Sequence, residues 1–205
     1  MASHPDKPGY HHGDLRAALL READQLLRED GIGGLSLRKL AERTGVSRMA
    51  PYHHFRDKNA LLSALAEEGF RALKAMIDNA RLGTGNEPAD GLRDFVRDYL
   101  RFATDHPERY ELMFGRPLWK SGEPTDALRE TAFAAFRHYA DRIAGLLQHG
   151  TLPAGSKPLR LAQASWATLH GLCKLLNDGI YVDRQDMEEV SEEAVRLMLA
   201  VVRPA

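Results

Sequence analysis

Apolar residues recur at helical spacing along most of the chain. In the first such segment they make one stripe at steps of three, four and eight, formed by Leu15, Ala18, Leu19, Ala23, Leu26 and Leu27. Asp14 is placed to cap the start of this helix and Gly31 to end it. No stretch alternates between apolar and polar residues for long enough to predict a strand. The pattern therefore predicts an all-α protein.

Three further helices follow at short intervals. Ser36 is placed to cap a short helix that runs to about Arg43, with Leu37, Leu40 and Ala41 facing inward. After the break at 44–46, Ser47 is expected to cap a third helix that ends near His54. A fourth, long helix is expected after Asp57, and its inward residues are Leu61, Leu62, Leu65, Phe70, Leu73 and Ile77.

The second part of the chain is also helical in pattern. The clearest break is the segment 82–88, which contains two glycines and a proline, and a second break lies at 151–157. Helices are expected over 89–105, 107–114, 125–149, 158–179 and 186–202, which makes about nine helices in all. We place a domain boundary after residue 62, so that the two predicted domains are 1–62, with 1–12 as an arm, and 63–205.

Composition narrows the class of protein. With 43% hydrophobic and 28% charged residues, the 205-residue chain has the balance of an ordinary globular protein. Its apolar runs are far shorter than the ~20 residues that span a bilayer, and no signal peptide is visible. The lone cysteine, Cys173, excludes an internal disulfide and suits a reducing compartment. These features predict a cytoplasmic protein that does not contact membranes.

Charge is unevenly distributed. The chain carries a net charge of −1, but segment 36–58 has six basic residues against two acidic ones. Such a local basic patch is typical of a small DNA-reading module, although a solvated helix surface would give the same count. The two short helices around Thr44-Gly45-Val46 favour the first interpretation, because they fit a helix-turn-helix with the glycine in the turn. An unrelated helical hairpin would imitate this pattern.

The same residues resemble a known family. The run 35–47 (LSLRKLAERTGVS), followed by 51–62 (PYHHFRDKNALL), is similar to the DNA-binding domain of tetracycline-repressor-type (TetR) regulators. The lead-in 10–16 (YHHGDLR) also resembles one branch of that family. Further along, 106–115 (HPERYELMFG) and Trp166-x-x-x-His170-Gly171 resemble the regulatory domain of the branch named for its W-H-G residues. The resemblance implies a homodimeric, ligand-responsive transcriptional regulator, usually a repressor.

The fold expected is thus an N-terminal three-helix helix-turn-helix domain with a C-terminal helical ligand-binding and dimerisation domain. In the third helix, Arg48 is placed for a bidentate contact to guanine, and Met49 and Ala50 for apolar contact to a thymine methyl. Tyr52 and His53 stand where family members touch phosphate or sugar, and Lys58 opens the fourth helix, where a phosphate is favoured. The candidate DNA-binding residues are Arg38, Thr44, Ser47, Arg48, Met49, Ala50, Tyr52, His53 and Lys58.

Several residues of this region have structural interpretations in place of DNA contact. Pro51 departs from the commoner family residue, and we expect it to delete the first hydrogen bond of the third helix. Phe55 is interpreted as core, as are Leu40 and Val46. The arm residues His4, Lys7, His11 and His12 would reach the minor groove if the arm is ordered, although arms of this kind are commonly disordered.

Aromatic residues in the C-terminal part predict a ligand pocket. A stripe of Trp and hydrogen-bonding groups runs along the helix that bears Trp166, which suits a mostly apolar cavity with a few polar anchors. The alternative is that these rings fill a core. The candidate ligand-binding residues are Phe95, Tyr99, Phe102, Tyr110, Met113, Phe114, Phe136, Tyr139, Trp166, His170 and Cys173.

No metal, cofactor or catalytic group is expected. His170 and Cys173 are three residues apart, but zinc needs four ligands and the His11-His12 pair has no evident third ligand. We find no nucleophile motif or phosphate-cradling loop, and an enzyme using His170 with Tyr139 or Asp141 is the weaker alternative. A DNA-binding dimer without a ligand, or an activator, remains open.

The last two helices predict the dimer. Leu161, Thr168, Leu172 and Leu175 form a second stripe beside Trp166, and the final helix carries Val190, Ala194, Leu197, Met198 and Val201. Helices with two apolar faces need two partners, so pairing with a symmetry mate in a four-helix interface is expected. Two-fold symmetry then predicts a palindromic double-stranded operator. A small-molecule effector is expected to act by shifting the population between two forms of the dimer.

Overall fold

The computed structural model describes residues 12–82, 88–120, 122–152, 157–180 and 184–200, and in these ranges it contains nine α-helices and one 3-10 helix. This confirms the predicted all-α class. The N-terminal part is formed by α1 (His12–Gly34), α2 (Leu37–Thr44), the 3-10 helix η1 (Ala50–His53) and the start of α3 (Lys58–Asn79). The remaining helices are α4 (Pro88–Asp105), α5 (Pro107–Phe114), α6 (Arg116–Trp119), α7 (Asp126–Gln148), α8 (Pro158–Asn177) and α9 (Arg184–Ala200).

From α2 to the turn at Gly45, the helix-turn-helix has the structure that its sequence predicts. The hydroxyl of Ser36 accepts a hydrogen bond from the Lys39 amide at 3.2 Å and caps α2. At the other end, Gly45 adopts φ 67°, the left-handed conformation that glycine takes without steric cost. The Val46 amide then donates to the Ala41 carbonyl at 3.1 Å, which closes the last turn of the helix. This turn fixes the direction in which the following segment leaves α2.

The third helix differs from its prediction. Ser47 does not cap an α-helix: the segment 48–49 is a turn, and the 3-10 helix η1 follows without a side-chain cap. The Ala50 amide donates to the Ser47 carbonyl at 3.0 Å, and His54 donates to Pro51 at 3.0 Å, both three residues back. Pro51 has no amide hydrogen to donate to Ser47, and this missing bond favours the tighter three-residue spacing.

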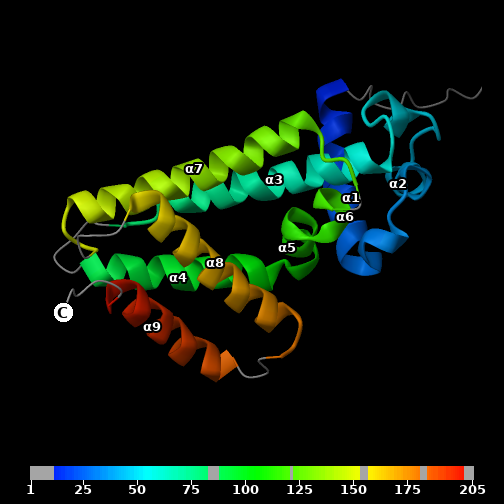
Figure 1. Cartoon of the computed structure of the whole chain (residues 1–205). Coiled ribbons are helices and arrows are strands. Elements are labelled where there is room, and N and C mark those ends of the chain that lie inside the picture. The colour runs from blue at the N-terminus through cyan, green and yellow to red at the C-terminus, as the bar shows by residue number, and fades with distance from the viewer. Residues whose placement is uncertain (1–11, 83–87, 121, 153–156, 181–183, 201–205) are drawn as a thin grey trace, which may run out of the picture.

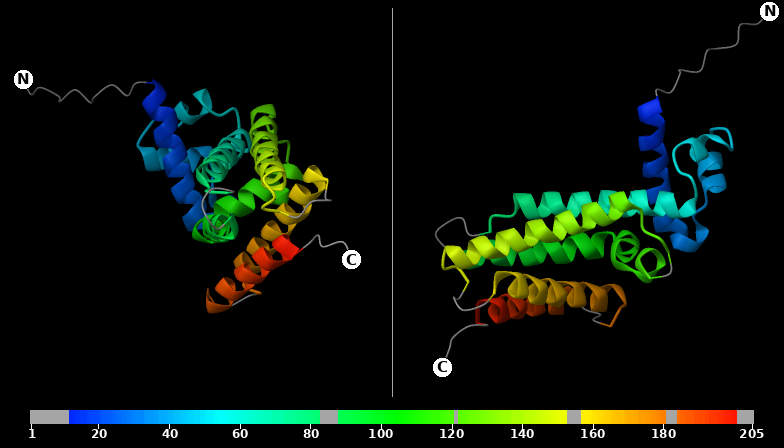
Figure 2. Two further views of the ribbon diagram at one scale, coloured as in Figure 1. Left: turned by 90° about the vertical axis from the view of Figure 1, so that its left-hand side faces the viewer. Right: turned by 45° about the horizontal axis from the view of Figure 1, so that its top comes forward.

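Two long helices form the frame of the molecule. α3 and α7 run side by side along most of the molecule's length, and the N-terminal part lies at one end of this pair (Figure 1). α4 lies beneath them, α8 packs on both α4 and α7, and α9 packs mainly on α4 (Figure 2). The inward residues predicted for the fourth helix are all buried in α3: Leu61, Leu62, Leu65, Phe70, Leu73 and Ile77.

α3 crosses the predicted boundary after residue 62, as expected of the long fourth helix, and joins the two parts. It begins at Lys58 and continues past residue 62 to Asn79, packing on α1 at its start and on α7 further along. The hydrophobic core is continuous from α1 through α3 to α8. α3 is therefore shared by both parts, and the division at residue 62 stays a prediction.

Two element boundaries also depart from the pattern. α1 continues to Gly34, with a kink at Gly31 where the backbone leaves helical geometry. α6 is only four residues long, too short for a periodic signal. Among the described helices, none is both long and apolar enough to cross a membrane.

Candidate nucleic-acid interface and regulatory cluster

The segment after the helix-turn-helix presents a mostly exposed tip. We call residues Arg48–His53 the recognition tip. Met49 is 61% exposed and Tyr52 46% exposed, and Arg48 and His53 are exposed as well. Pro51 is buried and attaches the tip to the core, while Ala50 is half-buried. Arg48, Met49, Tyr52 and His53, four of the predicted DNA-contacting residues, are therefore exposed together on this tip.

The basic residues around the tip are mostly occupied. Arg38 pairs with Glu42, Lys39 with Asp30, Arg43 with Glu22 and Glu29, and Arg56 with Asp57. Lys58 donates to the Ile32 carbonyl at 2.6 Å. Among the six basic residues of segment 36–58, only Arg48 makes no ion pair or side-chain hydrogen bond with the residues that the structure describes. The basic patch is thus less available than its residue count indicates.

Other predicted DNA contacts lie in varied settings. The Thr44 hydroxyl donates to the Leu40 carbonyl at 2.8 Å, inside its own helix, and Ser47 is exposed. Lys58 points at the carbonyls near the kink of α1 rather than away from the protein. Phe55 is buried as predicted, and the Arg16 guanidinium lies 5.5 Å from its ring centre. Leu40 is buried and Val46 is half-buried, so the core interpretation is confirmed for the first and holds only in part for the second.

Apart from Phe102, for which the described residues give no ring contact, the aromatic candidates of the C-terminal part meet in one place, which we call the ring cluster. Trp166 on α8 is its centre, with ring centroids 5.0 Å from Tyr139, 5.4 Å from Phe136 and 5.9 Å from Tyr99. Phe95 stacks on Tyr139 at 5.7 Å. A second group joins through Phe114, which contacts Trp166, Tyr110 and His170.

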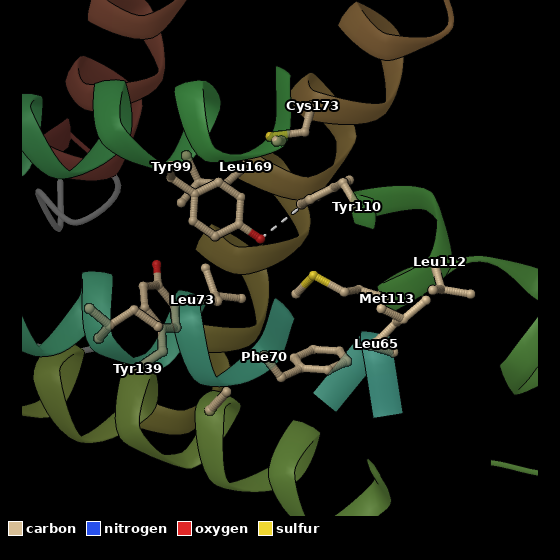
Figure 3. Packing of buried hydrophobic residues seen from close by; sticks show 14 of the residues in the cluster. Leu65, Phe70, Leu73, Tyr99, Tyr110, Leu112, Met113, Tyr139, Leu169 and Cys173 are labelled. Carbon is tan, nitrogen blue, oxygen red and sulfur yellow. Dashed lines mark hydrogen bonds between the residues drawn. The ribbon is translucent and has the colours of Figure 1, made fainter. Parts of the chain in front are cut away.

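Several polar groups lie inside the ring cluster. The Tyr110 hydroxyl is 2.8 Å from His170 Nδ1 and 3.3 Å from the Tyr99 hydroxyl (Figure 3 shows the bond between the tyrosines). The Tyr139 and Ser165 hydroxyls are 2.8 Å apart. These bonds satisfy hydroxyls that burial would otherwise leave without partners.

Burial sets the protonation of these groups. Desolvation raises the pKa of Tyr99 and Tyr110 well above the usual phenol range and the pKa of Tyr139 to about 12. It also raises the pKa of the Cys173 thiol to about 12 and lowers that of His170. The cluster is therefore electrically neutral near pH 7, as a site for an apolar ligand requires.

The ring cluster is closely packed. Phe95, Tyr99, Tyr110, Met113, Tyr139 and Cys173 are buried, whereas Phe102, Phe114, Phe136, Trp166 and His170 are half-buried. Grooves of about 880, 360 and 320 Å³ lie elsewhere: between α4 and α9, beside α1 and Val46, and beside the end of α1, α5 and α8. Among the described residues, no group of three or more metal-ligating side chains is placed to hold a metal ion.

The predicted dimer stripes are partly used within the chain. On α9, Ala194 and Met198 are buried and Val190 is half-buried, while Leu197 is 55% exposed. On α8, Leu161 is buried, Thr168 is exposed, and Leu172 and Leu175 are half-buried. Val201 lies outside the described residues, as do the arm residues His4, Lys7 and His11 and the side chain of His12.

Family models match both parts of this architecture. The model described as "Bacterial regulatory proteins, tetR family" matches residues 19–65, which include the helix-turn-helix. The model described as "Tetracyclin repressor-like, C-terminal domain" matches residues 92–205, more than half of the chain. The chain belongs to the TetR family. Its members are DNA-binding transcriptional regulators and not enzymes, and the resemblance found in the sequence is confirmed.

Relatives of this TetR-family chain include curated and solved proteins. The tetracycline repressor protein class C of Escherichia coli is 36% identical over 117 residues, which are 44% of this chain and 53% of that protein. The chain spans about half the length of the curated relatives it matches first. A protein of unknown function from Rhodococcus sp. RHA1 is 32% identical with a TM-score of 0.79, covering 94% of this chain and all of that one.

A more distant neighbour shares the fold alone. FadR from Bacillus subtilis, solved in complex with stearoyl-CoA, has a TM-score of 0.68 at 13% identity, covering 92% of this chain and all of that one.

Sequence reasoning missed the four polar residues that are buried among the described residues of this TetR-family chain, Asp24, Ser63, Glu67 and Ser165. Ser165 holds the Tyr139 hydroxyl, and Asp24 binds arginines from two helices. Asp24 carried a signal, since it is a carboxylate next to the apolar stripe of the first helix. Its partner Arg109 follows only from the packing of α5 on α1.

Proposed function

We propose that this chain is a homodimeric repressor that binds a palindromic operator through its recognition tip and is released by a small, mostly apolar ligand. The DNA-binding half of this proposal rests on the exposed side chain of Arg48. It is a basic side chain without a partner among the described residues, and it lies next to exposed Met49 on a protruding tip. A cation left free at the tip of a helix-turn-helix is available for a guanine edge.

The other tip residues have supporting roles in this proposal. Met49 and Ala50 face thymine methyl groups, and Tyr52 and His53 contact phosphate or sugar. Lys58, Arg38 and Thr44 are occupied within the protein, and they reach DNA only by exchanging these bonds for phosphate contacts. Such contacts orient the tip without reading sequence.

Selection of bound duplexes from a random DNA pool tests this half. The wild type is expected to enrich a palindrome whose half-sites are about one helical turn (~34–36 Å) apart, or a multiple of it. Arg48→Ala is expected to lose preference at one position of each half-site, by a factor of about 5 to 150, because one bidentate pair discriminates by ~1–3 kcal/mol. Arg137→Ala, an exposed arginine on α7, is the control and should select the same sequence. Failure to enrich any duplex would overturn the proposal.

The effector site in this proposal is the ring cluster. Its rings surround neutral hydroxyl, imidazole and thiol groups, a composition that suits an apolar ligand with one or two polar atoms. The complex of the fold neighbour FadR with stearoyl-CoA supports a ligand-responsive C-terminal part. The residues expected to contact the ligand are Phe95, Tyr99, Phe102, Tyr110, Met113, Phe114, Phe136, Tyr139, Trp166, His170 and Cys173.

A panel of aryl and long-chain acyl compounds, added to the protein on its selected duplex, tests the effector site. A compound that releases the duplex should do so less well with Trp166→Ala, which removes the central ring. Phe133→Ala is the control, because Phe133 on α7 is 61% exposed and, among the described residues, makes none of the ring contacts of the cluster. The close packing of the cluster favours one alternative, a DNA-binding dimer that needs no ligand, and a duplex that no compound of the panel releases would support that alternative. Equal release from both variants would overturn the ring cluster as the effector site.

The mechanism follows from linkage. A ligand that binds one form of the dimer better shifts the population towards it, by no more than its differential affinity for the two forms. α3 is the proposed lever, because it runs from the recognition tip into the layer beside the ring cluster. Dimerisation occurs through α8 and α9, and the site of action is the bacterial cytoplasm, where the DNA lies.

A further inference from the structure

A buried carboxylate connects the two parts of the chain. The side chain of Asp24 on α1 is only 8% exposed, and it is bound by two arginines. Arg28, one turn further along α1, donates to Asp24 Oδ2 at 2.6 Å. Arg109 comes from α5, 85 residues away in sequence, and its Nε donates to Asp24 Oδ1 at 2.8 Å. Arg109 is therefore the partner that connects α1, in the N-terminal DNA-binding part, with α5, in the C-terminal regulatory part.

α5 is short, and each of its sides contacts a different neighbour. Arg109 faces α1, while the next residue, Tyr110, binds His170 in the ring cluster. Met113 packs on Gly69 of α3 so closely that an added Cβ would lie 2.4 Å from its sulfur (Figure 3 shows Met113 between α5 and α3). A displacement of Tyr110 therefore displaces Arg109 with it.

We propose that Arg109 is the positioning residue that couples the ring cluster to the DNA-binding part, through its ion pair with buried Asp24. This inference rests on the proposed function. It concerns how the two sites communicate and not which ligand or operator they take.

The physical argument is the cost of leaving a buried charge poorly paired. Removing one partner from a buried ion pair is strongly unfavourable, whereas small joint movements that keep the pair are not. α1 therefore follows α5 when the ring cluster rearranges, and α1 carries α2 through the Arg43 pairs with Glu22 and Glu29. Coupling of this kind typically changes affinity by about 5- to 150-fold.

The chain offers a matched pair of variants. Arg109→Gln and Arg28→Gln each remove one arginine from the same carboxylate, but only the first removes a link between the two parts. Both tryptophans, Trp119 and Trp166, lie outside the DNA-binding part, so their emission reports the regulatory part when the tip binds DNA. Wild type and Arg28→Gln should change their emission when saturated with the selected duplex. Arg109→Gln should bind the duplex and lose most of that change, and Arg109→Lys should recover part of it.

Amide hydrogen exchange in the free protein supplies a second readout that needs no DNA. His170→Gln removes the Tyr110 bond and should speed exchange in residues 22–28 of α1. That effect should persist in the Arg28→Gln background and vanish in the Arg109→Gln background.

The outcomes separate the two proposals. If no duplex binds to the wild type, the proposed function fails, and amide exchange alone decides the coupling. If duplex binds but Arg109→Gln keeps the full emission change, or both glutamine variants lose it equally, the coupling role of Arg109 is overturned and the proposed function stands. The coupling role of Arg109 would also be overturned if His170→Gln changed amide exchange in α1 equally in all backgrounds.

Discussion

At the scale of single residues, the interior of this protein is organised by a few polar groups in apolar surroundings. Asp24, Ser165 and His170 each lie where a hydrophobic residue would pack, and each has a specific partner. Their partners come from other helices, so these bonds hold helices in defined relative positions. Two predictions concern individual residues of this interior.

The first prediction concerns the close approach of α3 and α5 at Gly69. Gly69→Ala adds a Cβ that would lie 2.4 Å from the Met113 sulfur, so the free energy of unfolding should fall by ~1–3 kcal/mol as the contact is overpacked. Gly145→Ala on α7 is the control: nothing lies within 4 Å of its added Cβ. That variant should gain ~0.5–1 kcal/mol from helix propensity. Urea unfolding of both variants measures the difference, and equal shifts would contradict the prediction.

The second prediction concerns pH. Burial lowers the pKa of His170, so the folded protein favours the neutral ring, with the nearby Glu111 opposing this effect and Lys174 adding to it. A histidine whose pKa is lower in the folded state stabilises the protein at pH values above its ordinary pKa of 6.5. This stabilisation is lost as the pH falls from 6.5 through the lower pKa of the folded state. The midpoint temperature of thermal unfolding should therefore decrease as the pH is lowered from 7.5 to 5.5, and it should decrease less in His170→Gln. An identical decline in both proteins would contradict this interpretation.

At the scale of elements, the recognition tip shows how one residue changes a helix. The sequence places two serines, Ser36 and Ser47, in equivalent capping positions. Only Ser36 begins an α-helix, because Pro51 removes the amide that would bond to the Ser47 carbonyl. The result is a compact 3-10 tip in place of a longer recognition helix, with Arg48 and Met49 in the turn before it.

The two serines give a prediction for the stability of these elements. Ser36→Ala should lower the free energy of unfolding by ~0.5–2 kcal/mol, since the cap hydrogen bond to the Lys39 amide is lost. Ser47→Ala should be close to neutral, because no side-chain cap is made there. Chemical denaturation followed by circular dichroism compares the two, and a larger loss in Ser47→Ala would show that η1 is capped in solution.

At the scale of the whole molecule, α8 and α9 lie on the side of the molecule away from α3 (Figure 2), and α8 packs on both α4 and α7. Their apolar residues divide between the inside of the chain and the outside. Ala194 and Met198 pack inward, whereas Leu197 on the same helix is 55% exposed. This exposed residue is the one that tests the dimer proposed through these helices.

Leu197→Glu is expected to dissociate the dimer, because it places a charge in an interface that should exclude water. Phe133→Glu on α7 is the matched control: Phe133 is 61% exposed but lies on a helix outside the proposed interface. Sedimentation velocity should show a monomer only for the first variant, with weaker duplex binding. A dimer that survives Leu197→Glu but not Phe133→Glu would move the interface to α7.

The sequence by itself determined the helices and the family. Periodicity predicted where α1, α2, α3 and the later helices lie, since an amphipathic stripe is a local property of the chain. The run from Ser36 to Leu62 also carried enough motif residues to indicate TetR-type DNA binding. The sequence also indicated that aromatic residues of several helices line one region, but not which rings contact each other across the four helices.

The tertiary structure decided which of those residues remain available. It engaged Lys58 with the carbonyl of Ile32 on α1, left Arg48 exposed at the tip, and buried much of the ring cluster. It also brought Arg109 to Asp24 across 85 residues of sequence. Such pairings depend on how helices cross, and a pattern of residues along the chain contains no information on which distant partner will satisfy a buried charge.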